Sequence, residues 1–464
     1  MRKLLAVIGL SALLFGCGGD DAGGNVAIVS NDGSSDNGQS SNTEQLAYVW
    51  DATVTSQEIK FSGSVKWSAK SDDNCKNWCY PVKSSDTSDK IVLWVSPNIT
   101  AKARSGKVTI QYGGKTQEIS VSQPAFSGNL DEYDYHLPVI FHVMYKNKSD
   151  KTQYPDKSQF TKILNAVNKL YADNQMHIVF EMAKYNDDGD ELEEPGIIRK
   201  EVDFDELSAD DFLKDEDYSD DVQNLKKYIN IFVFRFAQTS EETTSLGITT
   251  LPILPTDYKL DLLVSTDATN EYAYLTTPFG VCINNKYINE WQDEGYVKAT
   301  YIVSTVAHEL GHYIGLLHTF SEQECEEDDG CDDTHISDYE NYISYIEKYQ
   351  NDEIAKGKDP KTFTFKELGT RTDCKTGEEF LADNIMDYAY TLSDVFTAQQ
   401  KARTRHVLKY GSLVPGPKLI DYNTTGIVTK QRAAGRRAAL LPGMVQTDPC
   451  PPMPVRHLYP AGLK

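Results

Sequence analysis

Two histidines and one glutamate on a single predicted helix could carry metal chemistry. In the run H-E-L-G-H, His308 and His312 lie four residues apart, with Glu309 between them. This spacing places both imidazoles on one helical face, where they can bind one Zn²⁺, and leaves Glu309 at the flank to accept a proton from water. Gly315 can end the helix in a left-handed conformation, so that the chain turns and His318 becomes the third ligand. The fourth position then stays open for water, as in a catalytic zinc site.

A chance match or a purely structural role explains these residues less well than a metal site does. A bare H-E-x-x-H pattern also occurs among surface or core histidines. The extended motif fixes five residues, which are His308, Glu309, His312, Gly315 and His318. Each would match by chance about once in twenty, so a chain of this length would contain the whole motif by chance on the order of once in ten thousand. The apolar run 301–307 before the motif indicates a buried helix, which suits a rigid platform for metal ligands. The sequence therefore predicts a zinc hydrolase.

The extended motif and a later run of five residues resemble the metzincin clan of zinc peptidases. The later run is N-I-M-D-Y, which contains Met386 and Tyr388. Within the clan the chain is similar to the pappalysin and ulilysin-type peptidases, over roughly residues 137–412. It departs from that family by lacking a proline after Thr334 and by an insertion at about 338–366 that is rich in Tyr, Lys and Glu.

The resemblance assigns roles to residues that would otherwise be ordinary core. It implies that Met386 forms a hydrophobic floor beneath the metal, and that Tyr388 hydrogen-bonds the oxyanion or approaches the metal. It also implies that the segment 246–252 is an edge strand, whose unpaired amides bind the backbone of an extended substrate. The expected reaction is peptide hydrolysis by water, with one catalytic Zn²⁺ and with Glu309 as the general base.

Eight cysteines in a chain that we expect to be exported indicate disulfide bonds. The family resemblance favours a bond between Cys331 and Cys374. Elimination then leaves two further candidate pairs, which are Cys282 with Cys325 and Cys75 with Cys79. A second metal site built from these cysteines is the competing interpretation, and the lack of paired C-x-x-C spacing disfavours it.

An acidic loop lies between the third histidine and Thr334. Two interpretations of this loop stay open. The first is a Ca²⁺ site, because hard oxygen ligands cluster there and the resembling family binds calcium in this region. The second is a solvated loop without a metal. The acidic residues concerned are Glu326, Glu327, Asp328, Asp329, Asp332 and Asp333.

The N-terminus has the pattern of an export signal. Two basic residues precede an apolar run at 4–15, which is too short to span a bilayer and leads into L-F-G-C ending at Cys17. Residues 1–17 resemble a bacterial lipoprotein signal with lipid on Cys17, and a plain secretory signal is the alternative. Residues 18–44 predict a flexible tether, since their composition cannot bury a core. Asp20 and Asp21 resemble the signal of surface lipoproteins in Bacteroidetes, which predicts an outer-membrane lipoprotein exposed at the cell surface.

Residues 45–124 predict a separate all-β domain of the immunoglobulin-like sandwich type. Alternating apolar residues at 91–95 and 108–112 indicate half-buried strands, and a Gly-Gly pair at 113–114 indicates a hairpin. The pattern around Trp67 and Trp78 resembles the BACON module, which implies glycan or mucin binding only weakly. Both tryptophans are more often core residues than sugar platforms, so the simplest role for this domain is a spacer.

The formal net charge of −23 restricts the partners of this chain. It disfavours nucleic acid and an anionic membrane surface as binding partners. No other apolar run is long enough to cross a bilayer, so a lipid at Cys17 would be the sole membrane attachment.

The C-terminal residues of the chain have a different composition. Residues 424–464 contain six Lys or Arg and one acidic residue, with repeated Pro, Arg and Ala. The absence of apolar periodicity predicts a disordered or foreign tail, to which we assign no function.

These features predict a multidomain protein in which the β-sandwich precedes an α/β (α+β) metzincin peptidase domain at 137–412. The predicted function is a zinc-dependent endopeptidase that hydrolyses peptide bonds of extracellular proteins. The alternative function is a surface glycan- or mucin-binding lipoprotein whose peptidase domain is secondary.

Overall fold

The computed structural model describes eight segments of the chain. The predicted signal with Cys17, the predicted tether and Cys450 lie outside them. The described residues are 46–49, 56–237, 243–266, 277–291, 301–322, 324–420, 446–449 and 453–454. No helix within these segments is long and apolar enough to cross a membrane.

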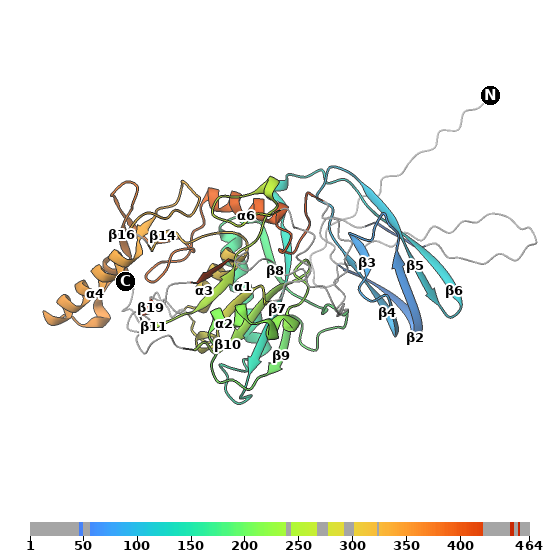
Figure 1. Ribbon diagram of the computed structural model, residues 1–464, viewed down its shortest axis with the longest axis horizontal. Coiled ribbons are helices and arrows are strands. Elements are labelled where there is room, and N and C mark those ends of the chain that lie inside the picture. Colours follow the sequence, from blue (N-terminus) through green and yellow to red (C-terminus); the bar gives the residue numbers. More distant parts are fainter. Residues whose placement is uncertain are drawn as a thin grey trace, which may run out of the picture.

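The N-terminal domain is an all-β unit, as its alternating sequence predicts (Figure 1). Gly113 and Gly114 turn the chain between β5 and β6 with φ of +52° and +74°, as a tight hairpin requires. The six strands lie in the order β1-β6-β5-β2-β4-β3. They are β1 (Leu46–Val49), β2 (Ser56–Ser71), β3 (Cys79–Pro81), β4 (Ser85–Val95), β5 (Arg104–Tyr112) and β6 (Lys115–Gln123).

Trp67 and Trp78 belong to the core of this domain. Their exposed fractions are 4% and 6%, and they pack with apolar residues such as Ile91, Leu93 and Val108. A sugar cannot stack on a ring that the protein already covers. These two tryptophans are therefore core residues rather than a sugar platform.

A mixed sheet forms the centre of the catalytic domain. Its strands follow the order β18-β12-β13-β10-β7-β8, and β9 also pairs with β7. β7, β8, β9, β10 and β13 run parallel to their neighbours, whereas β12 is antiparallel to β13. The bounds are β7 (Tyr135–Tyr145), β8 (Ile178–Met182), β9 (Ile197–Glu201), β10 (Ile229–Phe234), β12 (Gly247–Thr250), β13 (Val281–Asn284) and β18 (Thr447–Pro449).

Three long helices position the site around this sheet. α1 (Lys157–Asp173) packs against α3 (Ile302–Tyr313), and the Tyr171 hydroxyl donates to the Ala307 carbonyl at 2.9 Å. α6 (Ala398–Tyr410) begins with a capping box in which Thr397 and Gln400 exchange hydrogen bonds. Short α2 (Ala209–Lys214) covers the far end of the sheet near β12. The predicted mixed α/β architecture is confirmed.

The insertion forms a helical wall at the end of the molecule away from the N-terminal domain (Figure 1). Its apolar side buries Tyr342, Ile346 and Phe363 in one cluster with Tyr388. The elements of this wall are α4 (Tyr339–Ala355), α5 (Phe365–Gly369), and the short pairs of β14 (Phe320–Ser321) with β15 (Ser337–Asp338) and β16 (Thr370–Thr372) with β17 (Glu379–Leu381).

The N-terminal domain docks directly on the loop between β8 and β9. Lys83 Nζ lies 2.5 Å from Asp190 Oδ1, and Glu58 Oε1 lies 3.2 Å from Lys184 Nζ and also accepts a hydrogen bond from the Tyr185 hydroxyl. Burial alone would raise the pKa of Glu58, but the hydrogen bonds from Tyr185 and Lys184 outweigh it and lower this pKa to about 2. Charged contacts thus join the two domains.

The tail prediction is wrong for two short pieces of the chain. Thr447–Pro449 forms β18 and pairs with β12, while β19 (Met453–Pro454) pairs with β11 (Thr243–Thr244). These residues lack apolar periodicity, but strand pairing uses backbone groups and the side of β12 away from β13 offers them. The rest of 424–464 lies outside the described residues.

Candidate functional site

The structure brings the three predicted metal ligands together. His308 and His312 project from α3, and His318 returns from the loop after it. The Nε2 atom of His312 lies 2.9 Å from that of His308 and 3.1 Å from that of His318, and the remaining separation is 3.2 Å. All three side chains are buried, and they form a candidate metal-binding group.

Backbone carbonyls fix the orientation of two of these rings. His308 Nδ1 lies 2.8 Å from the Ile385 oxygen, and His312 Nδ1 lies 2.9 Å from the Leu316 oxygen. A carbonyl can only accept, so each Nδ1 carries the proton and each Nε2 presents a lone pair. Burial first, and the neighbouring His312 second, lower the pKa of His308 and His318 well below the usual range. The rings of His308 and His318 are therefore neutral, as metal ligands must be.

Converging lone pairs of this kind fit a bound cation. Ligand nitrogens at the usual Zn–N distance and tetrahedral angle are separated by about 3.3 Å, close to the 2.9 to 3.2 Å found here. Without a cation, three converging ring nitrogens would instead be an unfavourable arrangement in a buried space. The donor set is thus that of a transition-metal site with an open position.

Two glycines shape the turn beneath the histidines. Gly315 has φ of +97°, so the chain leaves α3 in a left-handed conformation and turns toward His318. At Gly311, a Cβ would lie 2.5 Å from the Met386 sulfur. Met386 is fully buried and packs directly against the histidine helix. This is the floor position that the family resemblance implies.

Glu309 is held against β12. The Thr249 hydroxyl donates to Glu309 Oε2 at 2.5 Å, and a Cβ at Gly247 would overlap the same carboxylate. Sequence reasoning assigned Gly247 and Thr249 to the expected edge strand at 246–252 but did not predict their contact with Glu309. Their signal is faint, because glycine and threonine occur in many short strands that have no part in catalysis.

A buried ion pair supports Tyr388. The Arg371 guanidinium contacts Asp387 Oδ1 and donates to the Tyr388 carbonyl, and Asp387 Oδ1 accepts from the Tyr388 amide at 2.7 Å. Burial raises the pKa of Asp387 to about 6, and the Arg371 charge opposes that rise. The Tyr388 ring lies 6.1 Å from the His308 ring, centroid to centroid. Sequence reasoning missed Arg371 and Asp387, although a buried acid in a motif calls for a cationic partner.

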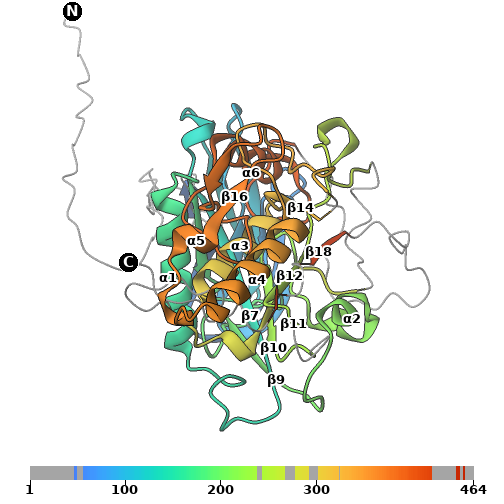
Figure 2. The same cartoon turned by 90° about the vertical axis from the view of Figure 1, so that its left-hand side faces the viewer.

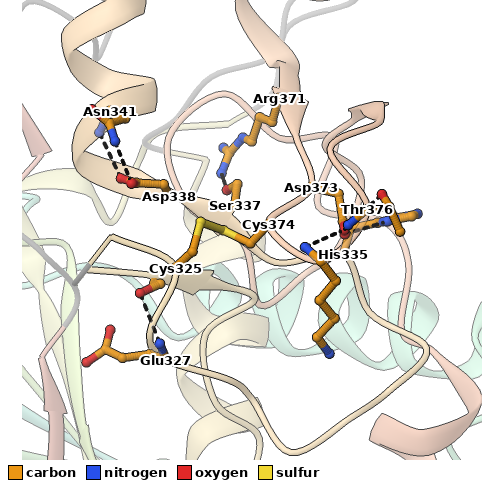
Figure 3. Close-up of a disulfide and its surroundings, with 12 residues drawn as sticks. Cys325, Glu327, His335, Ser337, Asp338, Asn341, Arg371, Asp373, Cys374 and Thr376 are labelled. Atoms are coloured by element: carbon orange, nitrogen blue, oxygen red, sulfur yellow. Dashed lines mark hydrogen bonds and ion pairs between the residues drawn. A yellow bond between two sulfur atoms is a disulfide. The ribbon is translucent and has the colours of Figure 1, made fainter.

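The predicted disulfide between Cys331 and Cys374 is wrong. Cys374 bonds Cys325 instead, with Cα atoms 5.6 Å apart, and Figure 3 shows this bond beside the loop held by His335 and Asp373. Cys325 lies in an exposed turn that reaches Cys374, whereas Cys331 is buried near Arg403. The family-based pairing therefore selected the wrong partner for Cys374.

The other two predicted pairs are absent as well. Cys282 is fully buried in β13 within the sheet core, so it cannot approach the exposed Cys325. Cys75 and Cys79 lie in one tight turn, where the Cys79 amide bonds the Cys75 carbonyl at 2.7 Å, and both are free thiols in the core.

The acidic loop shows no gathered set of metal ligands among its described residues. Asp329 is buried, and burial raises its pKa to about 6 while hydrogen bonds from Thr334 and the Cys331 amide oppose the rise. Asp328 pairs with Lys375 at 3.1 Å. The calcium interpretation stays a prediction.

Comparison with known proteins connects this geometry to a family. Residues 212–409 match the M43 peptidase model described as pregnancy-associated plasma protein-A, and residues 65–124 match the BACON model of an N-terminal binding domain. No curated protein is significantly similar to the chain.

Several solved structures share similarity at low identity. Mature mirolysin from Tannerella forsythia, solved with a cleaved peptide, is 19% identical over 59% of this chain and 90% of its own, with a TM-score of 0.39. A promirolysin mutant from the same organism is 19% identical over 61% and 83%, with a TM-score of 0.41. A Bacteroides thetaiotaomicron protein solved by NMR is 17% identical over 22% and 98%, with a TM-score of 0.14.

The family match and the histidine site define the chain as a metallopeptidase. Its residues 212–409 are similar to the pregnancy-associated plasma protein-A family of peptidases, and a region similar to the BACON domain precedes them.

Proposed function

We propose that the protein is a zinc-dependent endopeptidase that cleaves extracellular proteins. The observation that carries this proposal is the convergence of three buried imidazole nitrogens, two of them from the helix that also carries Glu309. His308, His312 and His318 would hold the zinc. When bound, zinc lowers the pKa of water and polarises the scissile carbonyl.

The residues of the chain supply binding and proton transfer. Glu309 accepts the proton of the attacking water and then donates it to the leaving amine. Tyr388 donates a hydrogen bond to the oxyanion that forms as the carbonyl carbon becomes tetrahedral. The side of β12 away from β13 binds the substrate as an added strand, because an extended peptide can hydrogen-bond the backbone amides and carbonyls on that side.

A peptide library tests this proposal. Zinc-loaded protein is incubated with mixed peptides, and mass spectrometry identifies the cleavage sites. We expect internal cleavages that a chelator abolishes. Glu309→Gln is the matched control, and it should retain about one zinc per chain while losing activity by several orders of magnitude. Equal cleavage by zinc-loaded wild type and Glu309→Gln would contradict the assigned base, and release of terminal residues alone would contradict an endopeptidase.

We also propose that lipid on Cys17 anchors the protein to the outer face of the outer membrane. The support is the sequence pattern that ends at Cys17, together with the acidic pair after it. Cells are labelled with a palmitate analogue and treated with an external protease. Wild type should be labelled, retained in the membrane fraction and cleaved, whereas Cys17→Ser should be unlabelled and released. Retention of the unlabelled variant would contradict the lipid anchor, and complete protection of wild type would contradict surface exposure.

Glycan or mucin binding by the N-terminal domain has less support. Trp67 and Trp78 are both buried, so neither ring is available to a sugar.

A further inference from the structure

A segment from the C-terminus already occupies the open side of β12. β12 pairs with β13 on one side and with β18 on the other, so β18 is the outermost strand of the sheet. Figure 2 shows β18, in red, beside β12. The Leu251 amide donates to the Gln446 carbonyl at 2.8 Å, and the Val264 amide donates to Gln446 Oε1 at 3.1 Å. This is the backbone edge that a substrate would use.

The two short tail strands follow one register along this edge. Pro449 pairs with Ile248, and Met453 pairs with Thr244. Four residues separate the partners in each strand, so neither strand gains or loses a residue between the two pairings. The stretch of edge between them includes Gly247, which touches the Glu309 carboxylate. The two described tail strands therefore pair with residues on either side of Gly247 along this edge.

The direction of the tail is antiparallel to β12. Leu251 and Gln446 form a hydrogen-bonded pair, so Thr249 and Asp448 form the next one, and Ile248 with Pro449 is a non-bonded pair. Proline has no amide hydrogen to donate. At a non-bonded position this loss costs nothing, because the amide would point away from β12.

Tethering also favours this placement. The segment is tied to the catalytic domain through the residues between 420 and 446, and such tethering gives effective concentrations of about 1 mM. A segment with an intrinsic Kd of about 0.1 mM would then raise the apparent KM for substrate about tenfold.

We propose that the C-terminal segment that carries β18, described at residues 446–449, is an internal competitive inhibitor that binds β12 in the place of a substrate strand. This inference rests on the proposed peptidase function. Release of the segment opens the edge, and the enzyme gains affinity for its substrate without any change in the catalytic groups.

The test uses the full chain with a recognition sequence for a site-specific protease inserted between residues 433 and 434. The protein is purified intact, and hydrolysis of a quenched peptide is measured before and after the cut and removal of the released tail. We expect KM to fall about tenfold with kcat unchanged, as competition at the substrate strand requires. Unchanged KM after the cut would overturn the inference. Inhibition that grows with protein concentration would also overturn it, because the occupant would then come from a second copy.

Two tail variants provide a matched pair in the uncut chain. Asp448→Pro removes an amide from a hydrogen-bonded position, so it should raise activity nearly as much as the cut. Thr447→Pro removes an amide that points away from β12, so it should leave the inhibition in place. Equal activity of the two variants would contradict the register.

A binding measurement separates this inference from the peptidase proposal. A fluorescent peptide of residues 445–456 is titrated into the cut chain that carries Glu309→Gln, and anisotropy reports binding. Saturable binding supports the inference even where the cut wild-type chain cleaves nothing, an outcome that would defeat the peptidase proposal alone. Cleavage by the cut chain without peptide binding would defeat the inference alone.

Discussion

The contact between Gly247 and Glu309 predicts a strong effect of one methyl group. A Cβ at Gly247 would lie 2.6 Å from Glu309 Cγ and closer still to the carboxylate, against an ordinary contact distance of 3.4 to 4 Å. Glu309 cannot simply turn away, because the Thr249 hydroxyl holds it at 2.5 Å and α3 holds its backbone. In Gly247→Ala, we therefore expect the carboxylate to move by about 1 Å.

The magnitude follows from the geometry of proton transfer. A misplacement of about 1 Å typically reduces the rate about 10²-fold, which is about 2.7 kcal/mol in the barrier. Gly247→Ala should thus lower kcat/KM about 10²-fold, measured with a quenched peptide after the C-terminal segment is released. Zinc content and Tm should stay close to wild type. Gly63→Ala is the matched control, since a Cβ there would meet nothing within 4 Å.

A double-mutant cycle tests whether the added methyl group acts through Glu309. If the methyl group acts through Glu309, then Gly247→Ala should change nothing further in a Glu309→Gln background. Activity of Gly247→Ala within about twofold of wild type would refute the reasoning. A full additional loss in the double variant would show that the methyl group blocks substrate instead.

Three further predictions test the remainder of the structure. Tyr388→Phe should lower kcat with little change in KM, by about 2 to 4 kcal/mol in the barrier, and a pure KM effect would contradict its role at the oxyanion. Alkylation of the unfolded, unreduced protein should label Cys331 but neither Cys325 nor Cys374, and labelling of Cys374 in the wild type would contradict the pairing. Cys325→Ser should lower the unfolding free energy by about 2 to 4 kcal/mol. Glu58→Gln should destabilise domain docking by about 1 to 2 kcal/mol near neutral pH, because a pKa lowered to about 2 is worth roughly 3 kcal/mol before partial exposure reduces it. A depressed pKa stabilises above the unfolded value, so this difference from wild type in chemical denaturation should vanish as pH falls from about 4.5 toward about 2, and a constant difference would refute the assignment.

The metal ligands could be predicted from sequence because their geometry is local. His308 and His312 are linked by helical periodicity, and one glycine accounts for the return of His318. The three distances in the structure follow from these short-range rules. Domain organisation was predictable for a similar reason, since strand alternation and helical periodicity are both properties of short windows.

The support of the site could not be predicted because it joins distant segments. Thr249 reaches Glu309 across sixty positions of the chain, and Arg371 reaches Asp387 from β16. No short sequence pattern predicts contacts between residues that lie so far apart in the chain. The disulfide failed for a related reason: which cysteine meets Cys374 depends on the path of the loop from 325 to 374, and a pairing carried over from relatives assumes that path.

The C-terminal strands show why the prediction of a disordered tail, which was based on composition, is wrong for these residues. Disorder was predicted because proline-rich, weakly apolar residues cannot build a core of their own. That reasoning holds for an isolated segment, but β18 needs no core of its own, because β12 supplies hydrogen-bonding groups. Proline opposes a strand only where its amide would be used, and Pro449 lies where it would not. An open edge at an active site therefore selects extended segments by register and direction, and the same property that makes β12 a substrate site makes it a site for the tail.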